Sequence, residues 1–387
     1  MSGARRREGE SEVEDWMKVL DRLPFVSSIK RDLVALRRLL YDRRAPRVAA
    51  IGLANSGRTS LANALLSAVT FGDGGAAPAP DPGRWVRIDA DGRRLDWIEL
   101  PADADPDALV EMARPAFDET VPDVLVGVVE ASSEERAAGP LHESLAALLA
   151  HLADRHGHKP PVLVVLTKVD TLPPSDAAPP YPPPKVEAIE HGLTVLRKRL
   201  ADLGQPKESF LGVCARPLLT EGAPRWNVDH LGETIVDHLP EAGRIEAVRA
   251  FEVGRDTKRR VARALVNSCS ALAMTIGLAP VPFADAFFLL PMQAAMVTGI
   301  AYLSGRPWNR RAAAEWLASV GVVGGAGLGL RWSAQQLVKL VPGAGSIVGA
   351  GVAGAGTLAI GRSAIAYFVD GPGNAVRRPE LRAENPA

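Results

Sequence analysis

The spacing of hydrophobic positions changes twice along the 387-residue chain. In residues 11–42 apolar side chains such as Val13, Trp16 and Leu20 recur at helical intervals. From residue 46 to residue 240 short apolar runs alternate with amphipathic stretches, which predicts strands alternating with helices. Beyond residue 263, three runs of 20 to 22 residues carry no charged side chain. The pattern therefore predicts a helical N-terminus, an α/β region and a hydrophobic helical region.

The middle region contains the clearest strand signals. Near-continuous apolar runs at 47–52, 124–129 and 162–167 are typical of strands buried on both faces of a sheet. Asp91-Gly92 separates two alternating runs and predicts a hairpin, and 210–214 is a candidate last strand. Amphipathic stretches at 141–155 and 185–204 predict helices between them. We expect a mostly parallel sheet with helices on both faces.

A glycine-bounded loop, GLANSGRT at 52–59, lies between the first predicted strand and the next helix. It matches the pattern G-x-x-x-x-G-K-[ST], whose backbone N–H groups bind phosphates, except that Arg58 replaces the lysine. The planar guanidinium keeps the positive charge but need not fit between phosphates as an ammonium does. The candidate phosphate-binding residues are Gly52, Asn55, Ser56, Gly57, Arg58, Thr59 and Ser60.

A second motif, TKVD at 167–170, directly follows an apolar run, at the strand end where α/β proteins bind ligands. It resembles the [NT]-K-x-D guanine-recognition motif of GTPases. A carboxylate at Asp170 can accept two hydrogen bonds from guanine that adenine cannot supply. In this hypothesis Thr167 tethers the loop and the stem of Lys168 packs on the base.

Residues 46–240 resemble the G domain of the Era/TrmE-type GTPases of the translation-factor-related class. Cys214-Ala215-Arg216 stands where that family has Ser-Ala-Lys, so the resemblance adds these three residues to the guanine-binding candidates. It implies an α/β P-loop G domain that binds GTP or GDP with Mg²⁺, with Thr59 and Glu99 as candidate metal ligands. Segments 280–305 and 341–368 resemble an uncharacterised hydrophobic domain fused to some bacterial GTPases.

The chain departs from the family at positions that matter for hydrolysis. The family's D-x-P-G appears as Glu99-Leu100-Pro101-Ala102, which moves the carboxylate and removes a glycine. The loop at 72–83 has no threonine, so the family's second Mg²⁺ ligand is missing or is supplied by Thr70. Because phosphoryl transfer depends on positioning and charge neutralisation, we expect weak or absent intrinsic hydrolysis and assign no catalytic residue.

The C-terminal third predicts four helices over 257–370, with breaks near Pro280–Pro282, Gly305–Pro307 and Pro342–Gly345. Runs of about 20 apolar residues are long enough to span a bilayer. Small residues at 349–356 allow close helix packing, and flanking arginines suit an anionic cytoplasmic leaflet. These features favour membrane association on the cytoplasmic face, integral or peripheral. A soluble packed bundle is the alternative.

Charge and composition exclude several other functions. With 45 basic and 45 acidic residues the formal net charge is zero, which argues against nucleic-acid binding. Two distant cysteines predict no disulfide. His151, His156 and His158 match no metal-ligand spacing and indicate a solvated helix end. The Pro-rich run at 173–184 is either an exposed insertion or a polyproline II ligand for an aromatic groove.

Together these patterns predict five segments: an N-terminal helical extension (1–45), a degenerate G domain (46–240), a linker helix (241–260), a hydrophobic helical domain (261–370) and a disordered tail (371–387). The leading hypothesis is a membrane-associated, guanine-nucleotide-binding switch or regulator, with membrane lipid and a protein partner or second GTPase as further partners. One alternative is a nucleotide-free pseudo-GTPase scaffold. The other is a slow GTPase activated in trans.

Overall fold

The computed structural model describes residues 43–68, 80–90, 92–215, 225–251, 253–278, 289–306, 308 and 345–371. The chain divides at Thr257 into an α/β unit, which begins at Arg43, and a helical unit. The predictions for the N-terminal helix, Thr70, Arg216, the third C-terminal helix and the tail beyond residue 371 lie outside the described residues.

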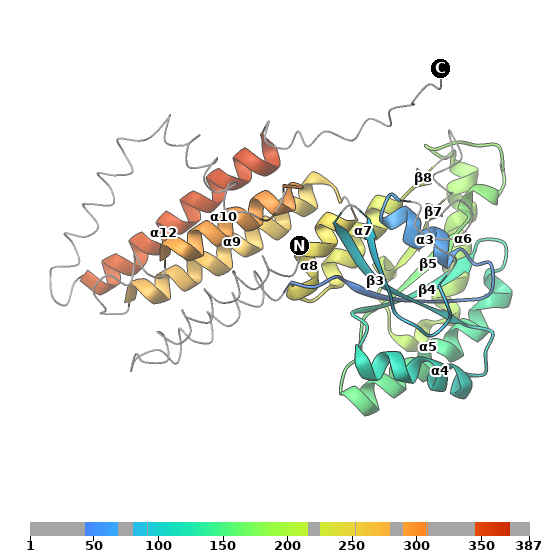
Figure 1. The fold of residues 1–387 in the computed structure, drawn as a ribbon. Helices are drawn as coiled ribbons and strands as arrows, with labels where there is room; N and C mark the ends of the chain where they lie inside the picture. The colour runs from blue at the N-terminus through green and yellow to red at the C-terminus, as the bar shows by residue number, and fades with distance from the viewer. Residues whose placement is uncertain are drawn as a thin grey trace, which may run out of the picture. The chain divides into compact units, whose positions relative to one another are not determined.

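A six-stranded sheet forms the centre of the α/β unit (Figure 1). Its strand order is β2-β3-β1-β4-β5-β6. Neighbouring strands from β3 through β6 run parallel, and β2 pairs antiparallel with β3. The strands are β1 (Arg47–Gly52), β2 (Val86–Ala90), β3 (Arg93–Pro101), β4 (Val124–Glu130), β5 (Val162–Thr167) and β6 (Phe210–Gly212). The predicted apolar runs are therefore the central strands of the sheet.

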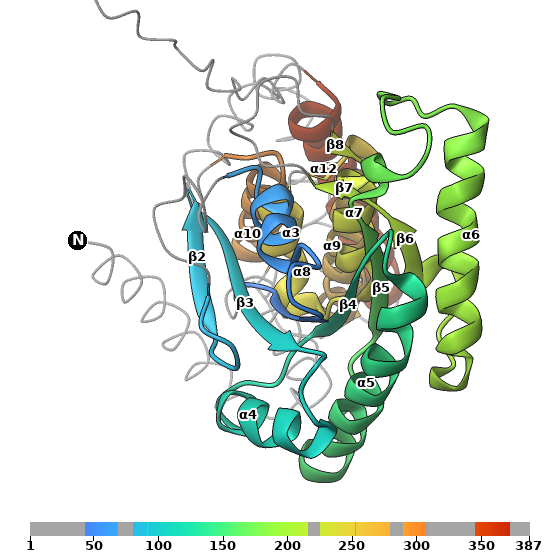
Figure 2. The same cartoon turned by 90° about the vertical axis from the view of Figure 1, so that its right-hand side faces the viewer.

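Helices cover both faces of this sheet (Figure 2). One face carries α4 (Pro106–Glu119), α5 (Glu134–His156) and α6 (Pro183–Arg199), and the other carries α3 (Arg58–Leu65), α7 (Val228–His238) and α8 (Glu241–Ala250). Alternate strand residues such as Ile51, Leu125 and Val164 form the core under α4, α5 and α6. Successive strand side chains point to opposite faces, so every central strand is apolar on both sides. The predicted α/β class is confirmed.

The predicted hairpin joins β2 and β3. Gly92 has a φ of 77°, a left-handed conformation that glycine adopts without steric cost, and its N–H donates to Asp89 Oδ1 at 2.9 Å. Beyond the sheet, β7 (Cys214–Ala215) pairs with β8 (Arg225–Trp226) as a short ribbon. In the part of the α/β unit that the structure describes there are also 3₁₀ turns, namely η1 (Val169–Thr171), η2 (Ala201–Leu203) and η3 (Lys207–Ser209).

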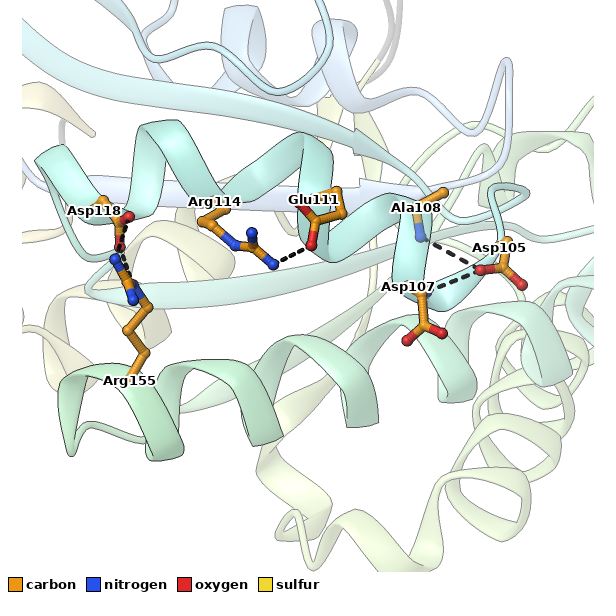
Figure 3. Close-up of polar contacts among 7 residues, drawn as sticks. All are labelled: Asp105, Asp107, Ala108, Glu111, Arg114, Asp118 and Arg155. Carbon is orange, nitrogen blue, oxygen red and sulfur yellow. Dashed lines mark hydrogen bonds and ion pairs between the residues drawn. The ribbon is translucent and has the colours of Figure 1, made fainter.

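Polar contacts fix α4 at both ends (Figure 3). Asp105 caps its N-terminus by accepting from the backbone N–H groups of Asp107 and Ala108. Near its other end, Asp118 accepts two hydrogen bonds from Arg155 of α5, at 2.6 and 2.8 Å. These contacts hold α4 against α5 on one face of the sheet.

The histidines at the end of α5 belong to the same polar cluster. His156 Nε2 lies 3.4 Å from Asp118, and the rings of His151 and His156 meet edge to face. Within the described ranges no group of three or more His, Cys, Asp or Glu side chains could hold a metal ion.

Helix α8, which the sequence analysis assigned to a linker, packs on the α/β unit. Its Glu246 is 1% exposed and pairs with Arg43 at 3.1 Å and with Arg94 of β3 at 3.0 Å. The backbone N–H of Arg44 also donates to the carbonyl of Ala242 at 3.1 Å. A buried carboxylate is tolerated only when its charge is paired, so these contacts join the first residues of the unit to α8.

The helical unit consists, in its described part, of α9 (Arg255–Leu278), α10 (Leu290–Leu303), α12 (Gly345–Ile365) and a π-helical turn η5 (Ala366–Asp370). Glycines of α12 pack directly on α9: a Cβ at Gly354 would lie 2.3 Å from Met274 Cγ, and one at Gly361 would lie 2.4 Å from Val266 Cγ2. Gln293 of α10 donates to Thr357 Oγ1 at 2.9 Å. The predicted all-α class and its close packing through small residues are confirmed.

One helical segment of the described chain is long and apolar enough to cross a membrane. This segment is Gly351–Asp370, which has a mean hydropathy of 1.4 over its apolar stretch, and 39% of that stretch is buried. Met292–Leu303 is a shorter apolar helix. Length and composition alone support this reading, since the core helix of a soluble protein has the same properties.

Candidate nucleotide-binding site

The candidate site lies where parallel strands end on one edge of the sheet. The loop after β1 leads into α3, Glu99 lies near the end of β3, and the TKVD motif spans the end of β5 and η1. In open α/β sheets this carboxyl edge is where ligands bind. The fold thus brings the two predicted motifs to the same edge.

The phosphate loop has a backbone that only small residues allow. Gly57 caps α3 with a φ of 96°, and a Cβ at Gly52 would lie 2.3 Å from the carbonyl oxygen of Val128. Asn55 also has a positive φ, of 63°. Ser56 is 3% exposed, and its Oγ has no hydrogen-bond partner among the described residues. A buried hydroxyl without a partner is costly, so this atom is suited to meet a polar ligand.

Arg58, the first residue of α3, folds back against this loop. Its Nη1 donates to the carbonyl of Gly52 and, at 3.1 Å, to that of Leu53. Its Nε donates to Glu99 Oε2 at 3.3 Å, and only 15% of its side chain is exposed. The guanidinium is therefore held by two carbonyls of the phosphate loop and by the carboxylate of Glu99.

Glu99 is surrounded by donors. Its Oε1 accepts from Thr59 Oγ1 at 2.9 Å and from Trp97 Nε1 at 3.2 Å, while Oε2 pairs with Arg58. The carboxylate is only 6% exposed. The two predicted metal ligands, Thr59 and Glu99, therefore do lie together.

Hydroxyl and carboxylate oxygens are the ligand types that Mg²⁺ prefers. Here, however, the negative charge of Glu99 is already neutralised by the guanidinium of Arg58 at 3.3 Å. A divalent cation beside Glu99 would meet a fixed positive charge in a largely buried setting, where repulsion is weakly screened. With Arg58 in this position, the residues present do not fit a Mg²⁺ ion.

The end of the candidate site that was predicted to bind the guanine base, called the base end below, centres on Asp170, which is 6% exposed. Cys214 Sγ donates to Asp170 Oδ1 at 3.3 Å. Lys185 Nζ donates to the carbonyl of Asp170 at 2.7 Å and to that of Pro174 at 2.9 Å. Lys185 is fully buried, so its ammonium fixes the backbone of the TKVD loop rather than meeting solvent.

Thr167 connects the two ends of the site. Its Oγ1 lies 2.5 Å from the carbonyl oxygen of Ser56 and 3.1 Å from that of Val129. The neighbouring Lys168 has a left-handed backbone, with a φ of 54°, and its Nζ lies 3.1 Å from Glu130 Oε1. The phosphate loop and the TKVD loop are thereby held in one arrangement.

Three further residues belong to this region although no sequence motif predicts them: Lys185, Tyr181 and Trp226. Lys185 Nζ lies 4.9 Å from the ring centroid of Tyr181, which in turn lies 5.1 Å from that of Trp226. Tyr181 is 8% exposed, so the end of the Pro-rich run packs beside the TKVD loop instead of standing free. A single aromatic residue within a proline run was the signal that could have indicated this.

The remaining candidates are placed less centrally. Ser60 lies inside α3, Asn55 is exposed, and Ala215 lies half-buried in β7 opposite Arg225. The third residue of the Cys-Ala-Arg motif falls outside the described ranges.

Comparison with known proteins yields one curated relative. No protein-family model matches the chain. The chain is 32% identical over 126 residues to magnetosome membrane protein 22 of Magnetospirillum gryphiswaldense, a match covering 31% of this chain and 62% of the relative. The match thus spans less than two thirds of the relative's own length.

Several solved structures share a general likeness. The FeoB G domain of Methanococcus jannaschii is 18% identical, with 50% of this chain and 98% of that chain covered and a TM-score of 0.28. Arabidopsis thaliana Toc33, solved with GDP and Mg²⁺, is 14% identical, with 57% and 92% covered and a TM-score of 0.32. A bacterial dynamin pair is 12% identical, with 93% and 73% covered and a TM-score of 0.32. Scores this low carry no argument about what this chain binds.

Proposed function

We propose that the α/β unit binds guanine nucleotides and acts as a GTPase-like switch or regulator. The observation that carries this proposal is the contact between Thr167 Oγ1 and the carbonyl of Ser56, which joins the TKVD loop to the phosphate loop. Such a contact is what one ligand spanning both loops requires. Asp170 supports guanine as the base, because Lys185 fixes its backbone and Cys214 donates to its buried carboxylate.

In this proposal the α/β unit alone hydrolyses GTP weakly or not at all. Glu99 is paired with Arg58, so it does not present a free carboxylate to a metal-bound triphosphate. Phosphoryl transfer needs charge neutralisation around the transferred group, and the described residues supply one cation there. The nucleotide would therefore act chiefly through binding.

We further propose that the helical unit associates with membrane lipid at the cytoplasmic face. The apolar segment Gly351–Asp370 and the printed name of the curated relative, a magnetosome membrane protein, both support this assignment. Nucleotide binding would then alter how the helices meet the bilayer or a protein partner, including a second GTPase.

The test of nucleotide binding is a titration of the full-length protein with fluorescent GDP and GTP, using ATP as competitor. We expect saturable binding that excess ATP does not displace, and we expect Asp170→Asn to weaken it by at least about tenfold, because a lost charged hydrogen bond costs about 1.5–3 kcal/mol. Asp176→Asn, in the exposed part of the Pro-rich run, is the matched control and should leave the affinity unchanged. Equal affinity for the Asp170→Asn protein would refute the guanine assignment.

The position of Arg58 supports a second candidate, a scaffold that binds no nucleotide. Its guanidinium already satisfies two carbonyls of the phosphate loop. This reading is correct if neither GDP nor GTP binds saturably to the protein purified intact.

A further inference from the structure

We propose that nucleotide binding at this site requires no divalent cation, because Arg58, held by Glu99, supplies the positive charge at the phosphates. This inference rests on the proposed function and concerns how that function is achieved. It starts from the arrangement of Arg58, Thr59 and Glu99, which the motif assigns to phosphate and Mg²⁺.

The negative charge of Glu99 is already paired within the protein. Its two oxygens accept from Thr59, Trp97 and Arg58, and the group is 6% exposed. A buried carboxylate needs a paired charge, and the guanidinium of Arg58 provides it. A divalent cation could bind Glu99 only by displacing the guanidinium of Arg58 from the carboxylate. The guanidinium would then lie close to the positive charge of the cation.

The second step is the reach of the guanidinium. Nε and Nη1 of Arg58 are bonded to Glu99 and to loop carbonyls, and among the described residues no acceptor is assigned to Nη2. Arg58 follows Gly57, the N-cap of α3, so the residue belongs to the first turn of a helix, whose N-terminus stabilises phosphate oxygens. A guanidinium forms directed hydrogen bonds to phosphate oxygens that a metal ion would otherwise neutralise.

The third step is an independent sign that a ligand belongs here. Ser56 Oγ is buried, has no partner among the described residues, and lies 2.6 Å from where a Cβ of Gly52 would be. The hydroxyl therefore lies close to Gly52, the residue whose carbonyl Arg58 contacts. A phosphate oxygen in the loop would satisfy it without a metal.

The experiment measures GDP affinity of the full-length protein in excess EDTA and in excess Mg²⁺. We expect the two dissociation constants to agree within about twofold, a difference of less than about 0.5 kcal/mol. In the absence of nucleotide, titration with Mn²⁺ followed by electron paramagnetic resonance should reveal no stoichiometric Mn²⁺ site. Loss of about tenfold in affinity on adding EDTA, or one tightly bound Mn²⁺ per chain, would overturn the inference.

Arg58→Lys provides the decisive variant. The lysine keeps the charge but lacks the Nε–H that donates to Glu99 and the planar guanidinium that contacts the loop carbonyls. We therefore expect GDP affinity to become stronger in Mg²⁺ than in EDTA by about fivefold or more. The matched control is Arg136→Lys, on the exposed surface of α5, which should behave as the unchanged protein in both conditions. A variant without metal dependence would count against the inference, provided its circular dichroism and melting curve match those of the control.

The two proposals fail in different ways. If no nucleotide binds in either condition, the proposed function is wrong and the inference falls with it. If GDP binds only when Mg²⁺ is present, the proposed function holds and the metal-independent mode alone is refuted.

Discussion

The two ends of the candidate site use polar side chains in opposite ways. At the base end, Lys185 and Thr167 bond to backbone carbonyls and so fix the loop, while the carboxylate of Asp170 accepts from Cys214 Sγ. At the phosphate end, Arg58 and Glu99 bond to each other. Both of these side chains are longer than the lysine and aspartate at the corresponding positions of the motifs that the sequence resembles. The two departures are therefore physically coupled, since each provides the partner that the other needs.

The largest expected effect is at the base end, with Lys185→Met. The substitution removes the ammonium that donates to the buried carbonyl of Asp170. Loss of a charged donor that leaves a buried acceptor unsatisfied costs about 2–4 kcal/mol. We expect that loss in the free energy of unfolding, measured by urea denaturation, together with weaker GDP binding. Lys198→Met, at an exposed position of the same helix, is the control. Unchanged stability would show that the base end is not held by this lysine.

An intermediate effect is expected at the phosphate end, with Glu99→Gln. The amide keeps a carbonyl acceptor for Thr59 or Trp97 but removes the charge that pairs with Arg58, so we expect a loss of about 1–2 kcal/mol in stability. The freed charge of Arg58 should strengthen GDP binding by about threefold or more. Calorimetric titration checks the affinity. Weaker binding would show that the loss of the contact that holds Arg58 in place outweighs the gain from removing the negative charge of Glu99.

The smallest effect should come from a position remote from both ends. Burial, with Arg114 and His156 nearby, lowers the pKa of His151 below its ordinary value. The unfolded chain then takes up the proton more readily, so this contribution to stability is complete above about pH 6.5 and is lost as pH falls through the folded-state pKa.

We therefore expect His151→Gln to reduce the fall in melting temperature between about pH 8 and pH 5, by about 1–2 °C. Since α5 runs back from the carboxyl edge, its last turn lies at the opposite edge of the sheet, and GDP affinity should not change. An altered affinity would show that the two edges are coupled.

Much of this architecture could be predicted from periodicity, because the central strands are apolar on both faces and the motifs directly follow them. The last strand shows where such reasoning ends. The run 210–214 was predicted as one strand, yet β6 ends at Gly212 and Cys214 pairs with Trp226 in a separate ribbon. The side chain of Asn227 donates to the carbonyl of Gly212 at 2.8 Å. Contacts with residues distant in sequence redirect the chain there.

The pairings at the site could not be predicted for the same reason. Hydropathy treats Lys185 as a solvated helix residue, whereas its burial depends on carbonyls of a loop that precedes the helix. The contact of Arg58 with Glu99 joins residues 41 positions apart, and a motif describes only what each residue does towards a ligand. Whether a side chain bonds to another part of the same chain instead of to a ligand is visible only when the fold is known.

The ion pair between Arg43 and Glu246 joins residues 203 positions apart, at the beginning and near the end of the α/β unit. A module whose two ends meet can be inserted into, or removed from, a longer polypeptide without stretching what surrounds it. The α/β unit therefore has the start and the end of its chain close together, as an inserted module requires.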